Sequence, residues 1–81
     1  MNKVAKTKYT LNDRQIQLLQ FYYHNKEEYT TPKMHMNIYQ ISKSTAIRDL
    51  QELKKEGFIS PKIVKKNTYY YATEKIEKLF K

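Results

Sequence analysis

The amino-acid sequence predicts one small α+β domain, in which a three-helix core is followed by a β-hairpin and a short C-terminal helix. Three observations predict it. Eighty-one residues leave room for a single hydrophobic core. The segment from Ser42 to Gly57 carries a helix start, an apolar stripe and a helix stop. Residues 58–72 are rich in β-branched and aromatic side chains around a polar turn.

The first helix is marked by its start signal. Asn12 can cap a helix, Gln15 can reach back to the Asn12 amide, and Leu11 and Ile16 occupy the two hydrophobic-staple positions. The pattern ends after Asn25. The inward stripe is formed by Ile16, Leu19 and Tyr23, and Leu18 and Tyr22 widen it. Residues 1–10 have no periodicity, so we expect a basic arm there, either a disordered terminus or a segment that tracks a groove, and a domain over residues 11–81.

A second helix is expected from Thr31, which can cap it, with Pro32 at its first position. Just before it, residues 29–30 can pair briefly as a strand. Spacing predicts that the second helix buries Met34, Ile38 and Ile41. Because only residues 39–41 separate it from the next helix, the two form a helix-turn-helix.

The third helix, over residues 43–56, begins after the cap Ser42 and ends before Gly57. Ala46, Leu50 and Leu53 fall on one stripe and should be core. The far side of the helix, which a partner could contact, carries Ser44, Arg48, Gln51, Glu52 and Lys55.

The residues after Gly57 are predicted to form a β-hairpin and a last helix. The first strand covers residues 58–64 and carries Pro61, so we expect it to be an edge strand or to be interrupted at that position. Residues 65–67 form a basic turn in which Asn67 can take a positive φ, and residues 68–72 form the second strand. Thr73 caps a short helix whose apolar side consists of Ile76, Leu79 and Phe80.

The charge balance favours a polyanionic partner. Sixteen Lys and Arg against 8 Asp and Glu give a formal net charge of +8, and a field of this sign attracts phosphate groups. No run approaches the ~18 apolar residues of a membrane span. The N-terminus lacks the apolar region of a signal peptide, and the chain has no cysteine. We therefore expect a cytoplasmic protein with no membrane partner.

The sequence offers little to a catalytic interpretation. There is no cysteine nucleophile, no Gly-x-Ser-x-Gly, and only one glycine, which excludes a glycine-rich phosphate loop. His24 and His35 lack a second metal ligand at helical spacing, and we expect His35 at the surface or partly packed. We therefore expect no enzymatic activity, no cofactor and no metal.

The predicted order of elements is that of a winged helix-turn-helix. Residues 41–59, with Ser-x-x-Thr-Ala-x-Arg-Asp-Leu from Ser42 to Leu50, resemble the recognition-helix signature of bacterial DeoR-type regulators. Leu-Asn-x-Arg-Gln at residues 11–15 is also similar to the C-terminal winged helix of many Fic-domain proteins. The first resemblance implies a bacterial or phage transcriptional regulator that binds duplex DNA. The second implies a protein-interaction or regulatory module, non-catalytic here because the Fic His-Pro-Phe loop is absent.

The DNA-binding interpretation places the helix over residues 43–56 in the major groove and a basic wing on the backbone. Arg48, which faces away from the core, can fork onto phosphate or guanine, or else pair with Glu52. Asp49 would repel phosphate, so we expect it to fix the helix by hydrogen bonding or by pairing with a basic neighbour. The expected DNA contacts are Lys43, Ser44, Thr45, Ile47, Arg48, Gln51, Lys55, Lys65 and Lys66.

Several of these positions have a second interpretation. Ser44 and Thr45 can bond DNA or take part in local capping, and Ile47 either contacts a thymine methyl or edges the core. Gln51 can bond adenine or simply be solvated. The wing tip lacks the Gly and Arg of the usual family pattern, which disfavours minor-groove readout by an inserted Arg.

Aromatic residues raise two further alternatives. Tyr69, Tyr70 and Tyr71 could stack on bases, but strand alternation favours a structural role. Phe21 is either covered by another segment of the chain or available for a subunit contact. Together with Phe80 and the last helix, it is where we expect a homodimer or partner protein to bind, since one such domain buries a small DNA interface.

Overall fold

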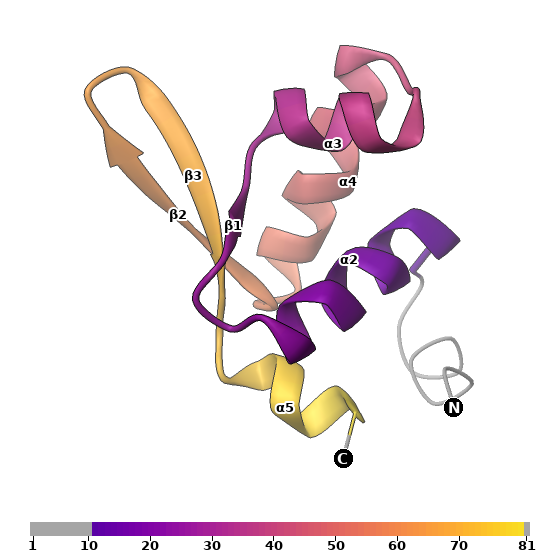
Figure 1. Cartoon of the computed structure of the whole chain (residues 1–81), viewed down its shortest axis with the longest axis vertical. Coiled ribbons are helices and arrows are strands. Elements are labelled where there is room, and N and C mark those ends of the chain that lie inside the picture. Colours follow the sequence, from indigo (N-terminus) through magenta and orange to yellow (C-terminus); the bar gives the residue numbers. More distant parts are fainter. Residues whose placement is uncertain (1–10, 81) are drawn as a thin grey trace.

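The computed structural model of the chain describes residues 11–80. Within them the order is α2 (Asp13–His24), β1 (Tyr29–Thr30), α3 (Pro32–Tyr39), α4 (Lys43–Lys55), β2 (Ile59–Val64), β3 (Asn67–Ala72) and α5 (Lys75–Phe80). The three larger helices pack together, α5 lies beside α2, and the β2–β3 hairpin projects from the helices (Figure 1). The predicted α+β layout is confirmed, whereas the expected basic arm, residues 1–10, lies outside the described residues.

Helix α2 starts as predicted. The Asn12 side chain accepts a hydrogen bond from the Gln15 amide at 2.8 Å, and the Gln15 side chain accepts one from the Asn12 amide at 2.8 Å. This reciprocal pair satisfies two amides that the helix itself leaves without partners. The capping box therefore fixes where α2 begins.

The turn between α3 and α4 is built without glycine. Gln40 takes a left-handed conformation with φ 55°, and the Ile41 amide donates to the Met36 carbonyl at 3.2 Å. Ser42 then caps α4 by accepting from the Thr45 amide at 3.3 Å. The short connection holds α3 directly against α4 and completes the helix-turn-helix.

The predicted buried side of α3 is wrong. Ile38 is 61% exposed and Met34 is also exposed, whereas His35 is fully buried. This burial is explained by a polar contact, because His35 Nε2 lies 2.9 Å from the Asp49 carboxylate on α4. Bonding to a buried carboxylate, rather than apolar periodicity, decides the rotation of α3. The expectation that His35 lies at the surface or only partly packed is wrong for the same reason.

Helix α4 ends in a Schellman motif. Gly57 has φ 87°, the Phe58 amide donates to the Leu53 carbonyl at 3.0 Å, and the Gly57 amide donates to the Lys54 carbonyl at 3.0 Å. The turn directs Phe58 into the core, which also contains Leu18, Leu19, Tyr22, Leu50, Leu53, Ile59, Tyr70, Ile76 and Leu79. The predicted stop at Gly57 is confirmed.

The three strands form an antiparallel sheet in the order β1-β3-β2, so β2 is an edge strand as its proline predicts. Pro61 lies opposite Tyr70 and Val64 lies opposite Asn67. That register leaves a two-residue turn in which Lys65, not Asn67, takes the positive φ of 59°. The brief strand β1 is confirmed by its pairing with β3.

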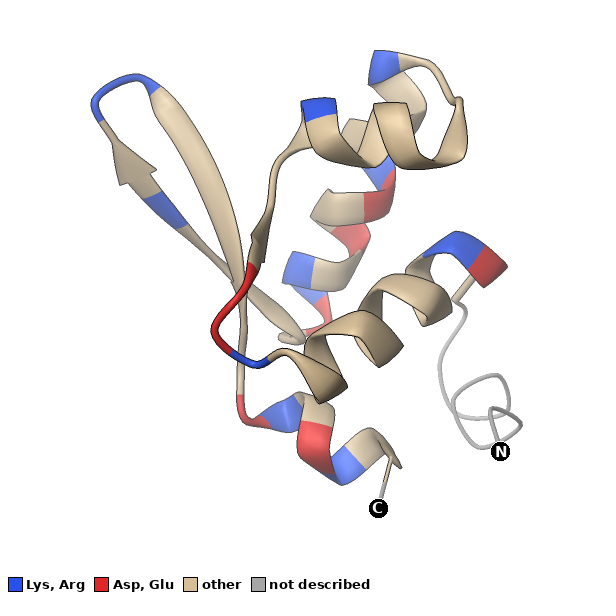
Figure 2. Ribbon diagram, viewed as in Figure 1, with Lys and Arg blue, Asp and Glu red and all other residues tan. Residues whose placement is uncertain are grey.

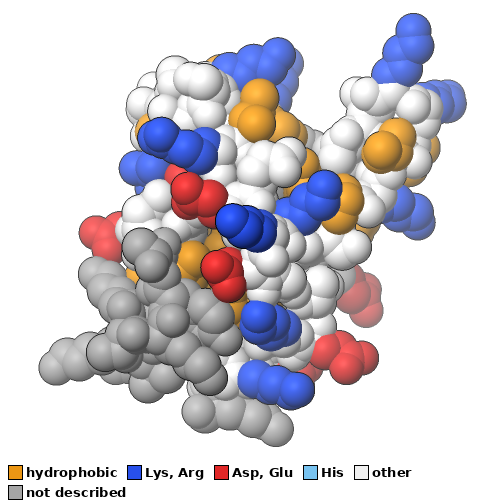
Figure 3. All heavy atoms as spheres, turned by 180° about the vertical axis from the view of Figure 1, so that it is seen from behind, with side chains coloured by type: hydrophobic (Ala, Val, Ile, Leu, Met, Phe, Trp, Pro, Cys, Tyr) orange, Lys and Arg blue, Asp and Glu red, His pale blue; other side chains and the backbone are white. Residues whose placement is uncertain are grey.

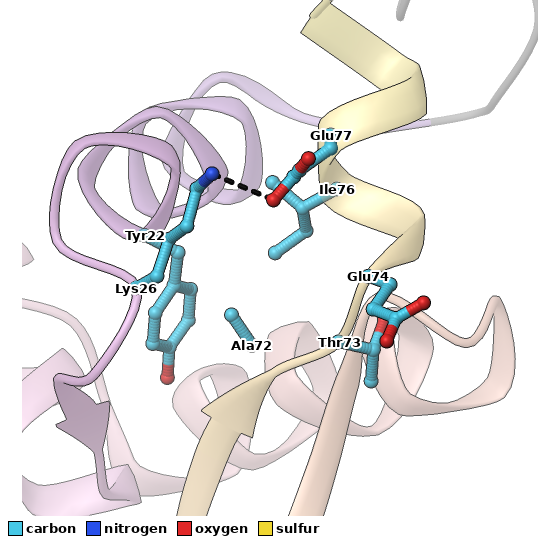
Figure 4. A pocket seen from close by; sticks show the side chains of 7 residues that line it. All are labelled: Tyr22, Lys26, Ala72, Thr73, Glu74, Ile76 and Glu77. Atoms are coloured by element: carbon cyan, nitrogen blue, oxygen red, sulfur yellow. Dashed lines mark hydrogen bonds and ion pairs between the residues drawn. The ribbon is translucent and has the colours of Figure 1, made fainter.

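Helix α5 closes the end of the domain opposite α3. The Thr73 hydroxyl donates to the Gly57 carbonyl at 2.6 Å and accepts from the Lys75 amide at 3.3 Å. A pocket of about 130 Å³ lies between α2, β3 and α5, and Figure 4 shows Lys26 and Glu77 joined across its opening. Their Nζ and Oε2 atoms are 2.6 Å apart. None of the helices within residues 11–80 has the length and apolar character needed to cross a membrane.

Candidate nucleic-acid interface

Helix α4 has one face buried and the opposite face open. Ala46, Asp49, Leu50 and Leu53 are buried, while Ser44, Arg48, Gln51 and Lys55 are exposed. At about 100° per residue the four exposed positions fall within one narrow sector opposite the buried ones. The outward face predicted from the sequence is therefore present on the folded domain.

The hydroxyls at the start of α4 form a local cluster. Ser42 Oγ lies 3.0 Å from Thr45 Oγ1 and 3.3 Å from Ser44 Oγ, in addition to its capping bond. Thr45 is half-buried by this arrangement, and Ser44 is exposed. The local capping role is thus present for Thr45, and Ser44 keeps an accessible hydroxyl at the N-terminus of the helix.

The Arg48 guanidinium makes no ion pair or hydrogen bond within residues 11–80. The alternative partner, Glu52, instead accepts a hydrogen bond from Gln15 Nε2 at 2.9 Å. Gln15 also donates to the Asp49 carbonyl at 3.0 Å, so it is fixed by bonds to α4. The i,i+4 pair between Arg48 and Glu52 is not formed, and the guanidinium is available to a partner.

Ile47 and Lys43 extend the open face toward its margin, and Gln51 lies within it. Ile47 is 37% exposed, so it edges the core without being enclosed by it. Gln51 and Lys43 are exposed. A partner lying along α4 would meet an aliphatic side chain, an amide and a lysine in addition to Arg48.

Asp49 lies at the centre of a polar network beneath α4. Its carboxylate accepts from Arg14 at 2.7 and 3.1 Å and from Asn12 at 2.9 Å, and it lies 2.9 Å from His35 Nε2. Burial by itself raises the pKa of Asp49, but the bonds from Arg14, Asn12 and His35 outweigh it, so its pKa lies below the ordinary value. The expectation that Asp49 bonds a basic neighbour is confirmed.

This network joins the two sequence motifs. Asn12, Arg14 and Gln15 of residues 11–15 all bond Asp49, which belongs to the Arg-Asp-Leu of α4. The sequence predicted a basic partner for Asp49 without saying which one, and nothing in it indicated that His35 would join. Arg14 on α2 and His35 on α3 therefore help to hold α4 in its orientation, although neither belongs to the exposed face of α4.

The wing carries the second group of cations. Lys62, Lys65 and Lys66 are exposed and form no ion pair within the described residues. Ile63 and Val64, at the end of β2, are 71% and 45% exposed. Tyr70 is buried, whereas Tyr69 and Tyr71 pack against Tyr29 with ring centroids 4.9 and 5.8 Å apart. These contacts agree with a structural role for the tyrosines.

Basic residues lie along the wing and on α3 and α4, and others lie on α2 and α5 (Figure 2). Figure 2 shows basic segments at the hairpin tip, on β2 and at the starts of α3 and α4. Figure 3, which shows the molecule from behind, has Lys and Arg side chains spread over this face and over the projecting hairpin, with fewer acidic ones among them. The acidic segments between α2 and β1 and on α5 lie away from the hairpin tip (Figure 2).

The residues expected at a subunit contact differ in exposure. Phe21 is exposed on α2, whereas Phe80 is half-buried and packs against Tyr23 at 5.3 Å between ring centroids. Phe21, Tyr23 and Phe80 line one shallow groove together with Gln17, Gln20, His24, Asn25 and Tyr39. The sequence thus identified two aromatic residues that line one groove.

Two solved structures resemble this one. The heme sensor protein PefR in complex with heme and carbon monoxide matches it with a TM-score of 0.77 and 25% identity, over 96% of this chain and 57% of that chain. PefR from Streptococcus agalactiae in complex with heme matches with a TM-score of 0.75 and 25% identity, over 98% of this chain and 59% of that chain. This chain has the winged-helix fold. It spans less than two thirds of the length of either PefR chain.

The likeness to PefR is a likeness of structure. No protein-family model matches the chain, and a search of curated proteins finds no match. The winged-helix architecture therefore rests on the observed helices and hairpin and on the two PefR structures.

Proposed function

We propose that this chain is a cytoplasmic bacterial or phage transcription regulator that binds duplex DNA. The observation that carries the proposal is the open face of α4, with Arg48 unpaired within the described residues, next to a lysine-tipped hairpin. A single α-helix fits the major groove, where a guanidinium can bond guanine or phosphate. The fold that the chain shares with the heme sensor protein PefR supports a regulatory role.

The contacts in this proposal divide into two kinds. Ser44, Thr45, Ile47, Arg48 and Gln51 would lie toward base edges, since they occupy the first turns and the outward face of α4. Lysines would bind phosphates and set the position of the helix on the duplex, and these are Lys43, Lys55, Lys65 and Lys66. A single winged helix buries a small area on DNA, so we include a homodimer or a partner protein at the Phe21 and Phe80 groove.

The heme of PefR is not part of the proposal. Of the two histidines in the chain, His35 is fully buried and its Nε2 bonds Asp49, so its ring is committed to the network beneath α4. His24 lies at the end of α2 with its ring against Tyr23.

The test is charge reversal with a matched control. Binding of a fluorescein-labelled, mixed-sequence duplex pool is measured by anisotropy for the wild type, Arg48→Glu, Lys65→Glu and the double variant. We expect the double variant to lose about a hundredfold or more in affinity, because two cations at the DNA surface become anions. Lys78→Glu, the same charge change on α5, should stay within about threefold of wild type. Equal losses in all variants would refute the proposal.

A second candidate function has its own supporting observation. Phe21, Tyr29, Met34 and Ile38 are exposed and line a largely apolar groove formed by α2, β1 and α3. Such a groove suits a winged helix that acts as a protein-interaction or regulatory module, as the resemblance to Fic-protein winged helices implies. Under this function the Arg48 and Lys65 reversals would leave partner binding unchanged, whereas Ile38→Ser would weaken it.

A further inference from the structure

The tip of the wing exposes two aliphatic side chains that the core does not use. Ile63 and Val64 are the last residues of β2 and are 71% and 45% exposed. Opposite them on β3 lie Thr68 and Asn67, which offer no apolar cover. Neither side chain belongs to the hydrophobic core or to the group of apolar residues packed against it. Their exposure is therefore not explained by the packing of the domain.

The surroundings of this pair are cationic. Lys62 precedes it and Lys65 and Lys66 follow it, and no acidic residue occurs from Gly57 to Thr73. Lys65 takes a left-handed φ of 59°, an unfavourable conformation for lysine that places the two charges in a tight turn. An aliphatic tip surrounded by cations complements a surface that is apolar at its centre and anionic at its edges.

The minor groove of duplex DNA presents such a surface where a base step is opened, because the faces of unstacked bases are apolar. Phosphates line both edges of the groove, and aliphatic side chains of some DNA-binding proteins insert between base steps from this side, unstacking them. The cost of unstacking is lowest at pyrimidine–purine steps such as TA. An aliphatic wedge thus prefers deformable steps, and it reads them without any hydrogen bond to a base.

Ile63 is the better placed of the two side chains. Strand alternation puts Ile63 on the same face of the sheet as the buried Ile59 and Tyr70, which is the face that packs on the helices. Val64 points to the opposite face. A duplex bound along α4 would therefore meet the Ile63 side of the projecting hairpin first.

We propose that the wing inserts Ile63 into the minor groove as an aliphatic wedge, with Lys65 and Lys66 on the flanking phosphates, so that the wing selects deformable pyrimidine–purine steps. This rests on the proposed function and deepens it. It gives the wing a second kind of readout in place of the inserted Arg that its tip lacks. The lysines supply salt-dependent affinity, and Ile63 supplies a salt-independent preference for sequence.

The test uses the whole chain and two duplexes of equal length and charge. One is alternating A·T, in which every second step is TA, and the other is a homopolymeric A-tract with no TA step. The wild type should bind the alternating duplex about tenfold more tightly, and 2-aminopurine at a TA step should brighten on binding. Ile63→Ser should abolish the preference and the brightening, and it should leave the salt slope unchanged.

Two matched variants complete the experiment. Lys65→Ala with Lys66→Ala should keep the preference for the alternating duplex and lower the salt slope by about 2, because each lysine neutralises one phosphate. Ile38→Ser removes another exposed isoleucine, 61% exposed on α3, and should change neither quantity. Circular dichroism confirms that each variant is folded.

Three results would overturn the proposal. In the first, the Ile63→Ser variant binds both duplexes within about twofold of wild type. This result would refute the insertion of Ile63 without contradicting the proposed function. A wild-type chain that bound neither duplex would overturn the function and the wedge together. Tighter binding to phosphatidylserine vesicles than to either duplex, abolished by Ile63→Ser, would assign the tip to a lipid surface instead.

Discussion

Replacing Asp49 by Asn should destabilise the domain strongly, although the two side chains have nearly the same size. The carboxylate is buried and accepts from Asn12 and twice from Arg14, with His35 Nε2 also at 2.9 Å. In the Asp49→Asn variant one carboxylate oxygen becomes an NH₂ group that points at donors. Asn12 cannot compensate by turning its amide, because its own oxygen caps α2.

The expected magnitude follows from the hydrogen bonds that the substitution removes. Either orientation of the new amide leaves at least one donor of Arg14 facing another donor, and the charge that attracted the half-buried guanidinium is gone. Removing one partner of a buried ion pair lowers the free energy of unfolding by about 3–5 kcal/mol. Because Arg14 is partly solvated, we expect a loss of about 2–4 kcal/mol here. For a domain of this size the melting temperature should fall by about 10–25 °C.

The assay is thermal unfolding followed by circular dichroism at pH 7, with Glu27→Gln as the matched control. Glu27 is exposed, so its conversion removes the same charge with the same change of atoms and should shift the melting temperature by less than about 3 °C. An Asp49→Asn domain that melted within about 3 °C of wild type would refute the inference that this network holds α4.

Three further predictions concern stability. Because its folded pKa is depressed, Asp49 contributes stability that is full above the unfolded pKa of about 4 and is lost as pH falls through the lower folded value. The difference in free energy of unfolding between wild type and Asp49→Asn should therefore be constant above about pH 5 and narrow below about pH 4, as urea titrations would show. Tyr22→Phe removes the 2.5 Å bond from the Tyr22 hydroxyl to the Tyr70 carbonyl, leaves that buried acceptor without the hydroxyl donor, and should cost about 1–2 kcal/mol in urea unfolding. Gly57→Ala meets only ordinary contacts with Lys75 but must hold φ near 87°, so calorimetry should show a loss of about 1–2 kcal/mol, whereas no loss would contradict the role of Gly57 in ending α4.

Local signals in the sequence were sufficient for most of the fold. Asn12, Ser42 and Gly57 mark ends of helices through bonds made within a few residues, and such bonds depend little on the rest of the chain. The edge position of β2 likewise followed from Pro61, since proline cannot donate within a sheet.

Polar contacts between residues far apart in the sequence could not be predicted in the same way. Apolar spacing predicted that α3 buries Met34 and Ile38, but the bond from His35 to Asp49, 14 positions away, rotates α3 to a different face. The turn was misassigned for a related reason. The pairing of Val64 with Asn67 places Asn67 in the strand, and the positive φ then falls on Lys65.

The candidate site shows the same division. The outward face of α4 could be predicted because helical periodicity alone separates Arg48 and Gln51 from Leu50 and Leu53. It could not be predicted from the sequence that Arg48 has no partner within the described residues. The state of Arg48 depends on Gln15, on another helix, donating a hydrogen bond to Glu52. The exposure of Ile63 also had no local signal, since an isoleucine in a strand is most often buried.

The open face of α4 and the tip of the wing can be tested together by NMR. A ¹⁵N-labelled chain is titrated with a mixed-sequence duplex pool at low salt, and amide shifts are mapped on the structure. If the domain binds DNA as proposed, the largest shifts fall on Ser44, Arg48, Gln51 and residues 63–66, and they disappear as salt is raised. Shifts confined to the groove around Phe21 and Phe80, or no shifts at any duplex concentration, would contradict the proposal that α4 reads DNA.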